Sequence, residues 1–204
     1  MRDLKFNLIS LMLRLKPALK SEIGKDSSRR VLSKMKNHYK EIDKREPKKK
    51  GIMTYHRQLW IIGLSLYRAM QEESYNNNDS IEIIHRVLWN TVLRQQTRAI
   101  AFFIRRSKNP FDRFLQFLGP RNDRFFPCPP WEKVEVELEN GFGWDQKKCP
   151  VYEYFKKEGV VELTRAYCDM DKLAAAFVPD HIELKRDRTL ANGDNSCDFY
   201  YYKK

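Results

Sequence analysis

The sequence predicts an α+β protein, with a helical N-terminal half followed by an antiparallel sheet of about four strands with two intervening helices. Three observations predict this fold class. Apolar residues recur at helical spacing over roughly the first 120 residues. Alternation with a period of two begins only after Pro127, and turn sequences rich in Gly, Asn and Pro separate the later segments. Helices and strands that are segregated along the chain are typical of α+β folds.

The N-terminal half is expected to form helices joined by polar connectors. Ser27 or Ser28 and Ser80 are plausible N-caps, and Gly119-Pro120 stops the last helix. The charged, Pro-containing connector at residues 45–51 predicts a boundary. We therefore expect an N-terminal helical extension over residues 1–50 and an α+β domain over residues 51–204. The predicted helices span residues 1–19, 27–44, 54–73, 80–104 and 110–118.

The spacing of apolar residues changes after Pro127, from a helical period to a period of two. Residues 133–141 alternate apolar and acidic side chains, which predicts a half-buried strand, and residues 142–148 are expected to return beside it. Pro150 opens a helix over residues 151–157, and a second helix covers residues 162–177. The remaining residues predict a hairpin whose strands span 181–190 and 197–202, joined by a loop at 192–195.

Charge and hydropathy exclude some classes of protein. The chain carries 39 Lys and Arg against 27 Asp and Glu, a net charge of +12. A basic protein can bind nucleic acid or an anionic membrane. The cations are scattered along amphipathic helices, however, with only one run at Lys48–Lys50, and no nucleic-acid-binding motif is present. We expect a solvated helical surface and no nucleic-acid partner. The same field would steer a small anionic substrate.

Cellular location is predicted from what the chain does not contain. The longest apolar-rich stretch, residues 59–69, is interrupted and is too short to span a membrane. Polar residues break the apolar part of the N-terminus, and no small-x-small cleavage site follows. A cytoplasmic protein is therefore expected. Four cysteines in a chain of this length do not form a secreted disulfide framework, so they should be reduced thiols.

Three of the cysteines fall at positions that suit chemistry. Cys149 comes directly before Pro150 at a helix start, where the helix dipole lowers a thiol pKa and favours the thiolate. Cys168 and Asp171 are three residues apart and share a helix face. Cys197 begins the last strand. The alternative is that each is a small buried hydrophobe. Cys128, which lies in a Pro-rich turn, is interpreted as structural.

Two further interpretations concern metals and arginines. Cys149, Cys168, Asp171 and Cys197 could converge as metal ligands, but no CxxC pair is present, and we expect neither a metal nor a cofactor. Arg186 and Arg188 are predicted to lie on one strand face, where the fork geometry of their guanidinium groups could hold a substrate carboxylate. A plain exposed strand face is the alternative.

The cysteine-bearing segments resemble a known family. The run from Arg186 to Phe199, RDRTLANGDNSCDF, is similar to the C-terminal signature of the L-2-amino-thiazoline-4-carboxylate hydrolase family. The family also carries Cys-Pro before a short helix, here Cys149-Pro150, and Cys-x-x-Asp on the next helix, here Cys168 and Asp171. More distantly, the paired strands look like small-molecule-binding domains related to vinyl reductases and aromatic-effector sensors.

The resemblance implies a hydrolase-like domain that opens a cyclic amidine or isothiourea ring, such as that of L-2-amino-thiazoline-4-carboxylate, to a carbamoyl-cysteine. Such an enzyme would act on carbon–nitrogen bonds. The catalytic candidates are Cys149, Cys168, Asp171 and Cys197, with Cys149 or Cys197 as nucleophile and Asp171 as acid and base. The substrate-binding candidates are Arg188, Asp194 and Arg186, with Arg188 as carboxylate clamp; water activated by Asp171 or Asp194 is the alternative route.

Two questions stay open at this level. The rival function is a non-catalytic small-molecule-binding or sensor domain of the vinyl-reductase-related fold, in which the cysteines are structural or bind a metal. The expected partner under the enzyme hypothesis is a small anionic heterocyclic substrate. For the oligomeric state, a homodimer is one possible arrangement.

Overall fold

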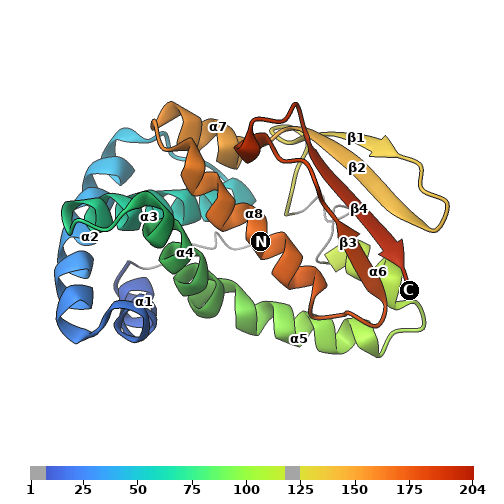
Figure 1. The fold of residues 1–204 in the computed structure, drawn as a ribbon, viewed down its shortest axis with the longest axis horizontal. Coiled ribbons are helices and arrows are strands. Elements are labelled where there is room, and N and C mark those ends of the chain that lie inside the picture. Colours follow the sequence, from blue (N-terminus) through green and yellow to red (C-terminus); the bar gives the residue numbers. More distant parts are fainter. Residues whose placement is uncertain (1–7, 118–124) are drawn as a thin grey trace. The chain divides into compact units, whose positions relative to one another are not determined.

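Both predicted parts of the chain, the helical half and the antiparallel sheet, are present in the computed structural model, which describes residues 8–117 and 125–204 (Figure 1). The α+β fold class is therefore confirmed. The chain divides into two compact units, of which the first ends at Leu93 and the second runs from Arg94 to Lys204. The boundary expected at residue 50 lies inside the first unit, and a separate extension over residues 1–50 stays a prediction.

The described part of the first unit is built from helices. Its longest apolar helix is α3, whose side chains are buried on most of its faces because the sequence between Tyr55 and Met70 is almost continuously apolar. An amphipathic helix, α2, buries one stripe that includes Val31, Met35 and Ile42. The elements are α1 (Leu8–Ile23), α2 (Lys25–Arg45), α3 (Ile52–Glu72), α4 (Asn77–Leu88) and the π-helical turn η1 (Trp89–Leu93).

The single helix predicted over residues 80–104 is wrong in two respects. Its first part, α4, begins at Asn77 with Asn76 as the N-cap in place of Ser80. The structure also interrupts the predicted helix with the π-helical turn η1, after which α5 (Arg94–Arg105) begins in the second unit. Buried residues step by four from Ile84 to Leu88 and Val92, but the next buried residue, Thr97, lies five positions on. A π-helical turn accommodates one extra residue, and this one lies where the chain passes from one unit to the other.

The second unit combines helices with a four-stranded antiparallel sheet in the order β1-β2-β4-β3 (Figure 1). The predicted hairpin is present, although β3 is shorter than expected and the connection to β4 is longer. The elements after α5 are α6 (Pro110–Phe117), β1 (Glu132–Val136), β2 (Gly141–Lys148), α7 (Pro150–Lys157), η2 (Val161–Leu163), α8 (Thr164–Ala175), β3 (Ile182–Lys185), η3 (Leu190–Asn192) and β4 (Cys197–Lys203).

The core of the second unit lies on one face of the sheet, which we call the core face. Trp144 of β2 pairs with Phe199 of β4, and their rings stack with centroids 4.7 Å apart and planes 2° apart. Because successive strand residues point to opposite faces, Tyr201 shares this face with Phe199. Residues of α5, α6 and α8 pack against it, including Ala101, Ile104, Phe111, Phe114, Leu115 and Ala175. Helices thus cover the core face.

The first strand differs from its prediction. Residues 132–136 do form a strand that pairs with β2, but the side chain of Val134 is 53% exposed. The half-buried strand expected from the alternation is therefore wrong in its burial. β1 is an edge strand, and Val134 pairs with Asp145, so it lies on the face opposite the core. Separately, no helix among the described residues is long and apolar enough to cross a bilayer.

Candidate functional site

The three cysteines lie where the sequence predicts, on three different elements. Cys149 is the N-cap residue of α7 with Pro150 as the first helical residue, Cys168 lies within α8, and Cys197 is the first residue of β4. Cys197 pairs with Gln146 on the core face, two positions before Phe199. The core face therefore ends at Cys197, beyond the aromatic residues. The other two cysteines come from α7 and α8.

The three thiols lie close enough together to affect one another's pKa, and we call them, with Asp171 and Arg186, the cluster. Burial raises the pKa of Cys149 to about 12, and the nearby thiol of Cys197 and carboxyl of Asp171 add to this, while backbone amides of Tyr152 and Val151 oppose it. Burial also raises the pKa of Cys168 well above its ordinary value. The position of Cys149 was predicted correctly, but the lowered pKa expected there was not, because desolvation outweighs the helix N-terminus.

Of the three cysteines, Cys197 is the buried residue, whereas Cys149 and Cys168 are partly exposed. Its Sγ accepts a hydrogen bond from the backbone N–H of Leu190, at a distance of 3.2 Å. Burial raises its pKa, and the Leu190 amide and the Arg186 guanidinium oppose that shift. At neutral pH, therefore, all three thiols are protonated.

Arg186 connects the two members of the Cys-x-x-Asp segment. Its Nη1 lies 3.1 Å from Oδ2 of Asp171, and its Nη2 donates to the carbonyl oxygen of Cys168 at 2.8 Å. The guanidinium also lies over the Phe199 ring, 5.1 Å from its centroid. Burial raises the pKa of Asp171, although the Arg186 charge opposes this. The pair thus combines a permanent cation with a carboxyl group that holds its proton more readily than usual.

Two buried polar atoms near this pair have no hydrogen-bond partner within the described protein. One is Nε of Arg186, whose side chain is only 1% exposed, and the other is Oγ1 of Thr164 at the start of α8. Thr164, Cys168 and Asp171 follow at helical spacing, so they share one stripe of α8. An unsatisfied buried donor is costly, on the order of 1–3 kcal/mol. Such groups mark positions where a bound polar molecule would be stabilised.

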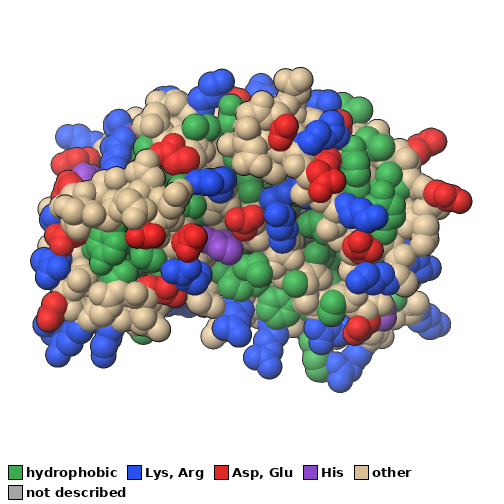
Figure 2. Space-filling model, viewed as in Figure 1, with side chains coloured by type: hydrophobic (Ala, Val, Ile, Leu, Met, Phe, Trp, Pro, Cys, Tyr) green, Lys and Arg blue, Asp and Glu red, His purple; other side chains and the backbone are tan. Residues whose placement is uncertain are grey.

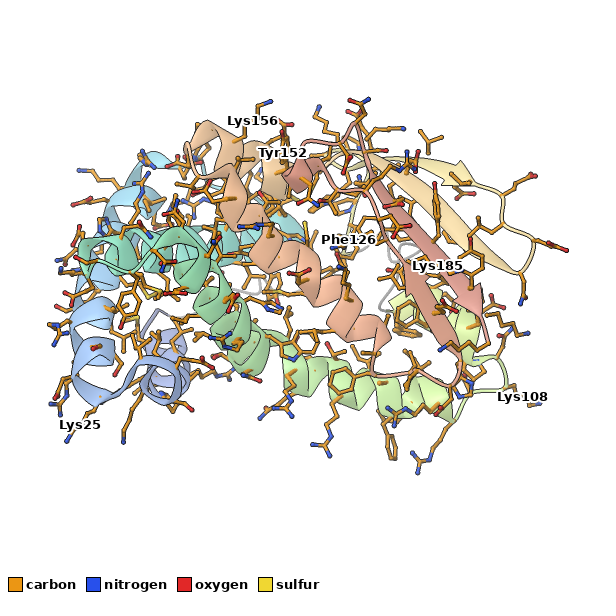
Figure 3. The ribbon with its side chains drawn as sticks, in the orientation of Figure 1. Lys25, Lys108, Phe126, Tyr152, Lys156 and Lys185 are labelled. Carbon is orange, nitrogen blue, oxygen red and sulfur yellow. The ribbon has the colours of Figure 1, made fainter. Side chains whose placement is uncertain are left out.

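Arg188 points to the opposite face of the sheet. Its Nη2 donates to Oδ1 of Asp145 at 3.2 Å and to the hydroxyl of Tyr200 at 3.0 Å. The expectation that Arg186 and Arg188 share one strand face is wrong, because β3 ends at Lys185 and both arginines lie in the connection that follows. Lys185 lies on the same face as Arg188, over the ring of Tyr202, with Nζ 4.8 Å from its centroid. Figure 3 labels Lys185 on β3.

Two aspartates fold the connection between β3 and β4. The buried carboxylate of Asp198 accepts the backbone N–H of Arg188 at 2.7 Å and that of Asp187 at 3.1 Å. The carboxylate of Asp194 accepts the backbone N–H of Thr189 at 2.8 Å. In the described residues, no hydrogen bond or ion pair joins Arg188 or Asp194 to the three thiols. Five of the seven candidates thus interact with one another, whereas the side-chain hydrogen bonds described for Arg188 and Asp194 go to other groups.

A metal centre is not evident in this cluster. Over residues 8–117 and 125–204, no group of three His, Cys, Asp or Glu side chains is arranged to hold a metal ion. The chemistry available here is that of three protonated thiols, one carboxyl group and one guanidinium.

Sequence reasoning missed Tyr201 as a neighbour of the cluster. Burial raises its pKa well above the ordinary value, and the Asp171 carboxyl and Arg186 guanidinium are both close enough to affect it. The signal was available, because Cys197, Phe199 and Tyr201 follow at a period of two. The carboxylate of Asp145, whose pKa is lowered by Lys147, Tyr200 and Arg188 against burial, was also missed. Its partners come from a strand that is distant in sequence.

Comparison with known proteins assigns the family. Residues 53–201 match the family described as L-2-amino-thiazoline-4-carboxylic acid hydrolase. The chain belongs to this hydrolase family. The resemblance found in the three motif segments is thereby confirmed, and the match extends well upstream of them, into the helices of the first unit.

The other comparisons add little to the family assignment. No curated protein matches the chain in sequence. Among solved structures, an Fe(II) unliganded H-NOX protein from K. algicida is similar over 96% of this chain and 95% of its own, with 7% sequence identity and a TM-score of 0.46. A likeness at this level supports no conclusion about the activity of this hydrolase-family member.

Proposed function

We propose that this member of the family hydrolyses a cyclic amidine or isothiourea that bears a carboxylate, such as L-2-amino-thiazoline-4-carboxylate, to a carbamoyl-cysteine. The observation that carries the proposal is the bridge made by Arg186. Its guanidinium pairs with Asp171 and binds the carbonyl of Cys168, in a cluster that also includes the thiols of Cys149 and Cys197. These residues come from the three segments that carry the resemblance to the hydrolase family, and this supports the proposal.

Cys149 is the proposed nucleophile. It is half-buried, whereas Cys197 is almost fully enclosed, and backbone amides of Val151 and Tyr152 stabilise its thiolate. The resting thiol is protonated, so a base must remove its proton during the reaction. Asp171 suits that role, because the raised pKa of its carboxyl makes the carboxylate a stronger base than an aspartate with an ordinary pKa.

The proposed reaction consumes one water molecule. The Cys149 thiol gives its proton to Asp171 as its sulfur adds to the ring C=N carbon, which is electrophilic in the protonated amidine. Asp171 then returns this proton to the ring atom whose bond to that carbon breaks. Water, deprotonated by Asp171, attacks the same carbon and displaces the Cys149 thiol, which recovers its proton. Direct attack by water with Asp171 as base is the alternative route.

Carboxylate recognition is proposed for Arg186 in place of Arg188. Nε of Arg186 is a buried cationic donor with no hydrogen-bond partner within the described protein, and the neutral hydroxyl of Thr164 also lacks one. A carboxylate that reached Nε would gain a charge-assisted hydrogen bond. Arg188, in contrast, is engaged by Asp145 and Tyr200 on the other face of the sheet.

The test is turnover of L-2-amino-thiazoline-4-carboxylate by the purified full chain. We expect Cys149→Ser to lower kcat at least a hundredfold, since removing an essential nucleophile has effects of this order or larger. Cys128→Ser is the matched control, because Cys128 is exposed and lies outside the cluster. A free amine in the product would indicate cleavage of a ring carbon–nitrogen bond, and a free thiol would indicate cleavage of the carbon–sulfur bond.

Several outcomes would overturn parts of this proposal. Unchanged turnover in a folded Cys149→Ser variant, with loss in Asp171→Asn, would leave the water route. No turnover by the wild-type chain, combined with thermal stabilisation by the same compound, would favour a non-catalytic binding module instead.

A further inference from the structure

Helix α5 carries an exposed face with an unusual combination of side chains. Arg98, Phe102 and Arg106 follow at intervals of four residues, the last of them just beyond the end of α5, and so align on one side. Phe102 is 50% exposed, and its neighbour Phe103 is 72% exposed. The opposite side of the helix is the buried one, where Thr97, Ala101 and Ile104 face the interior. The exposed aromatic pair is therefore not needed for the core of the unit.

The segment that carries this face is strongly positive. Residues 94–117 contain six Lys and Arg and one Asp, whereas residues 118–204 contain 14 Lys and Arg and 16 Asp and Glu. Figure 2 shows hydrophobic side chains between Lys and Arg side chains along the region of α5. An amphipathic helix with large apolar side chains flanked by cations is the pattern that binds the surface of an anionic bilayer.

The geometry of the Phe102 ring makes it less suited to stacking on a base. The Phe102 and Phe103 rings are 5.5 Å apart between centroids and nearly perpendicular, at 88°. The guanidinium carbon of Arg106 lies 3.6 Å from the centroid of the Phe102 ring and covers that face. A nucleobase needs an open ring face for stacking. Insertion of a ring between lipid headgroups needs only an exposed apolar edge.

We propose that this α5 face, made of Arg98, Phe102, Phe103 and Arg106, docks the protein on an anionic lipid surface. Phe102 and Phe103 enter the boundary between headgroups and acyl chains, while Arg98 and Arg106 contact lipid phosphates and carboxylates. A second copy of this chain would bring two positive surfaces together, and like charges oppose such a contact. The proposal differs for this helix from the sequence interpretation of a simply solvated cationic surface.

The test is co-sedimentation of the full chain with vesicles of phosphatidylcholine that contain a minority of phosphatidylserine, compared with pure phosphatidylcholine. We expect binding to the mixed vesicles alone, weakening as salt is added. Replacing both arginines, Arg98→Gln with Arg106→Gln, should weaken binding on the order of twentyfold, at about fivefold per charge near the surface. Phe102→Ser with Phe103→Ser should weaken it about tenfold or more.

The control is Val134→Ser, because Val134 is a similarly exposed apolar residue on a strand that also carries Glu132 and Glu135. It should bind vesicles as the wild type does. Equal binding to both kinds of vesicle, or none, would overturn the proposal. So would tighter binding to single-stranded RNA that the same variants abolish, or a dimer in solution that the Phe variant dissociates. Ring hydrolysis without lipid is expected to be unchanged in all of these variants.

Discussion

Cys149 shows how burial and backbone dipoles compete at a single residue. An N-cap position with two nearby amides would normally favour a thiolate. Here the loss of solvent is the larger effect, and the pKa rises to about 12. A reactive thiolate would therefore form only when a base takes the proton during catalysis. This explains why the Asp171 carboxyl, whose own pKa is raised by burial, matters as much to the proposed chemistry as the sulfur does.

Alkylation rates test this description of the thiols. Iodoacetamide should modify the exposed Cys128 first at neutral pH, while Cys149, Cys168 and Cys197 react slowly. The rate at Cys149 should continue to rise with pH through the range where an ordinary thiol has levelled off, because its pKa is about 12. Peptide mass spectrometry after timed labelling measures each site. A plateau near neutral pH would show that Cys149 is already a thiolate.

The same pKa shift has a defined sign for stability. Folded Cys149 keeps its proton up to a pKa of about 12, whereas the unfolded thiol releases it near its ordinary value of 9.0. Between these values the folded state binds more protons, so the free energy of unfolding falls as pH rises. A Cys149→Ser variant lacks this contribution, and the wild type should lose stability relative to it across that range.

At the scale of elements, the two faces of strand β4 carry different kinds of side chain. Cys197, Phe199 and Tyr201 lie on the core face beside α8, whereas Asp198, Tyr200 and Tyr202 lie on the other. On that other face, the Asp198 carboxylate holds the preceding connection in place, because it accepts hydrogen bonds from the backbone amides of Asp187 and Arg188. By holding the connection directly after Arg186, this carboxylate helps to fix the guanidinium that bridges Asp171 and Cys168.

Removing the Asp198 carboxylate should therefore loosen the connection. We expect Asp198→Ala to lower the free energy of unfolding by about 1–3 kcal/mol, because two partly buried backbone donors lose a charged acceptor. Amide hydrogen exchange at Asp187 and Arg188 should accelerate at the same time. Asp187→Ala is the control, since that side chain is exposed. Unchanged exchange at these two amides in Asp198→Ala would contradict the assignment.

Much of this arrangement could be predicted from sequence periodicity, and the exceptions have physical causes. The period of two after Cys197 indicates which side chains share a face, and Cys149-Pro150 indicates a helix start. The inward turn of Arg186 could not be predicted, because it depends on contacts with α8, which is distant in sequence. The π-helical turn was missed because a single five-residue step, from Val92 to Thr97, is a weak signal among helical spacings.

At the scale of the whole molecule, the family match and the compact units do not coincide. The match begins at residue 53 and so includes α3 and α4 of the first unit as well as the second unit as far as β4. Within the first unit, Arg57 of α3 is tied to the segment that precedes it. Its guanidinium is paired with Asp43, 2.5 Å from Oδ1, and donates to the carbonyl oxygens of Glu46 and Pro47.

Deletion of residues 1–50 should therefore damage the first unit. The truncated chain loses the acceptors of Arg57 and the helix α2 that carries Val31, Met35 and Ile42, so the apolar helix α3 becomes exposed. We expect a lower melting temperature and aggregation, measured by calorimetry and size-exclusion chromatography. A soluble, monomeric truncated protein that melts as the full chain does would show that residues 1–50 are a dispensable extension.

The alternation of β4 also limits how this sequence can change length. One residue added or lost between Cys197 and Tyr201 would exchange the two faces, so that Asp198 would enter the aromatic core and the thiol would leave it. A residue added in the exposed turn at Asn192 and Gly193 would leave every pairing of the strand intact. Related chains should accordingly vary in length within that turn, while β4 changes only by substitution.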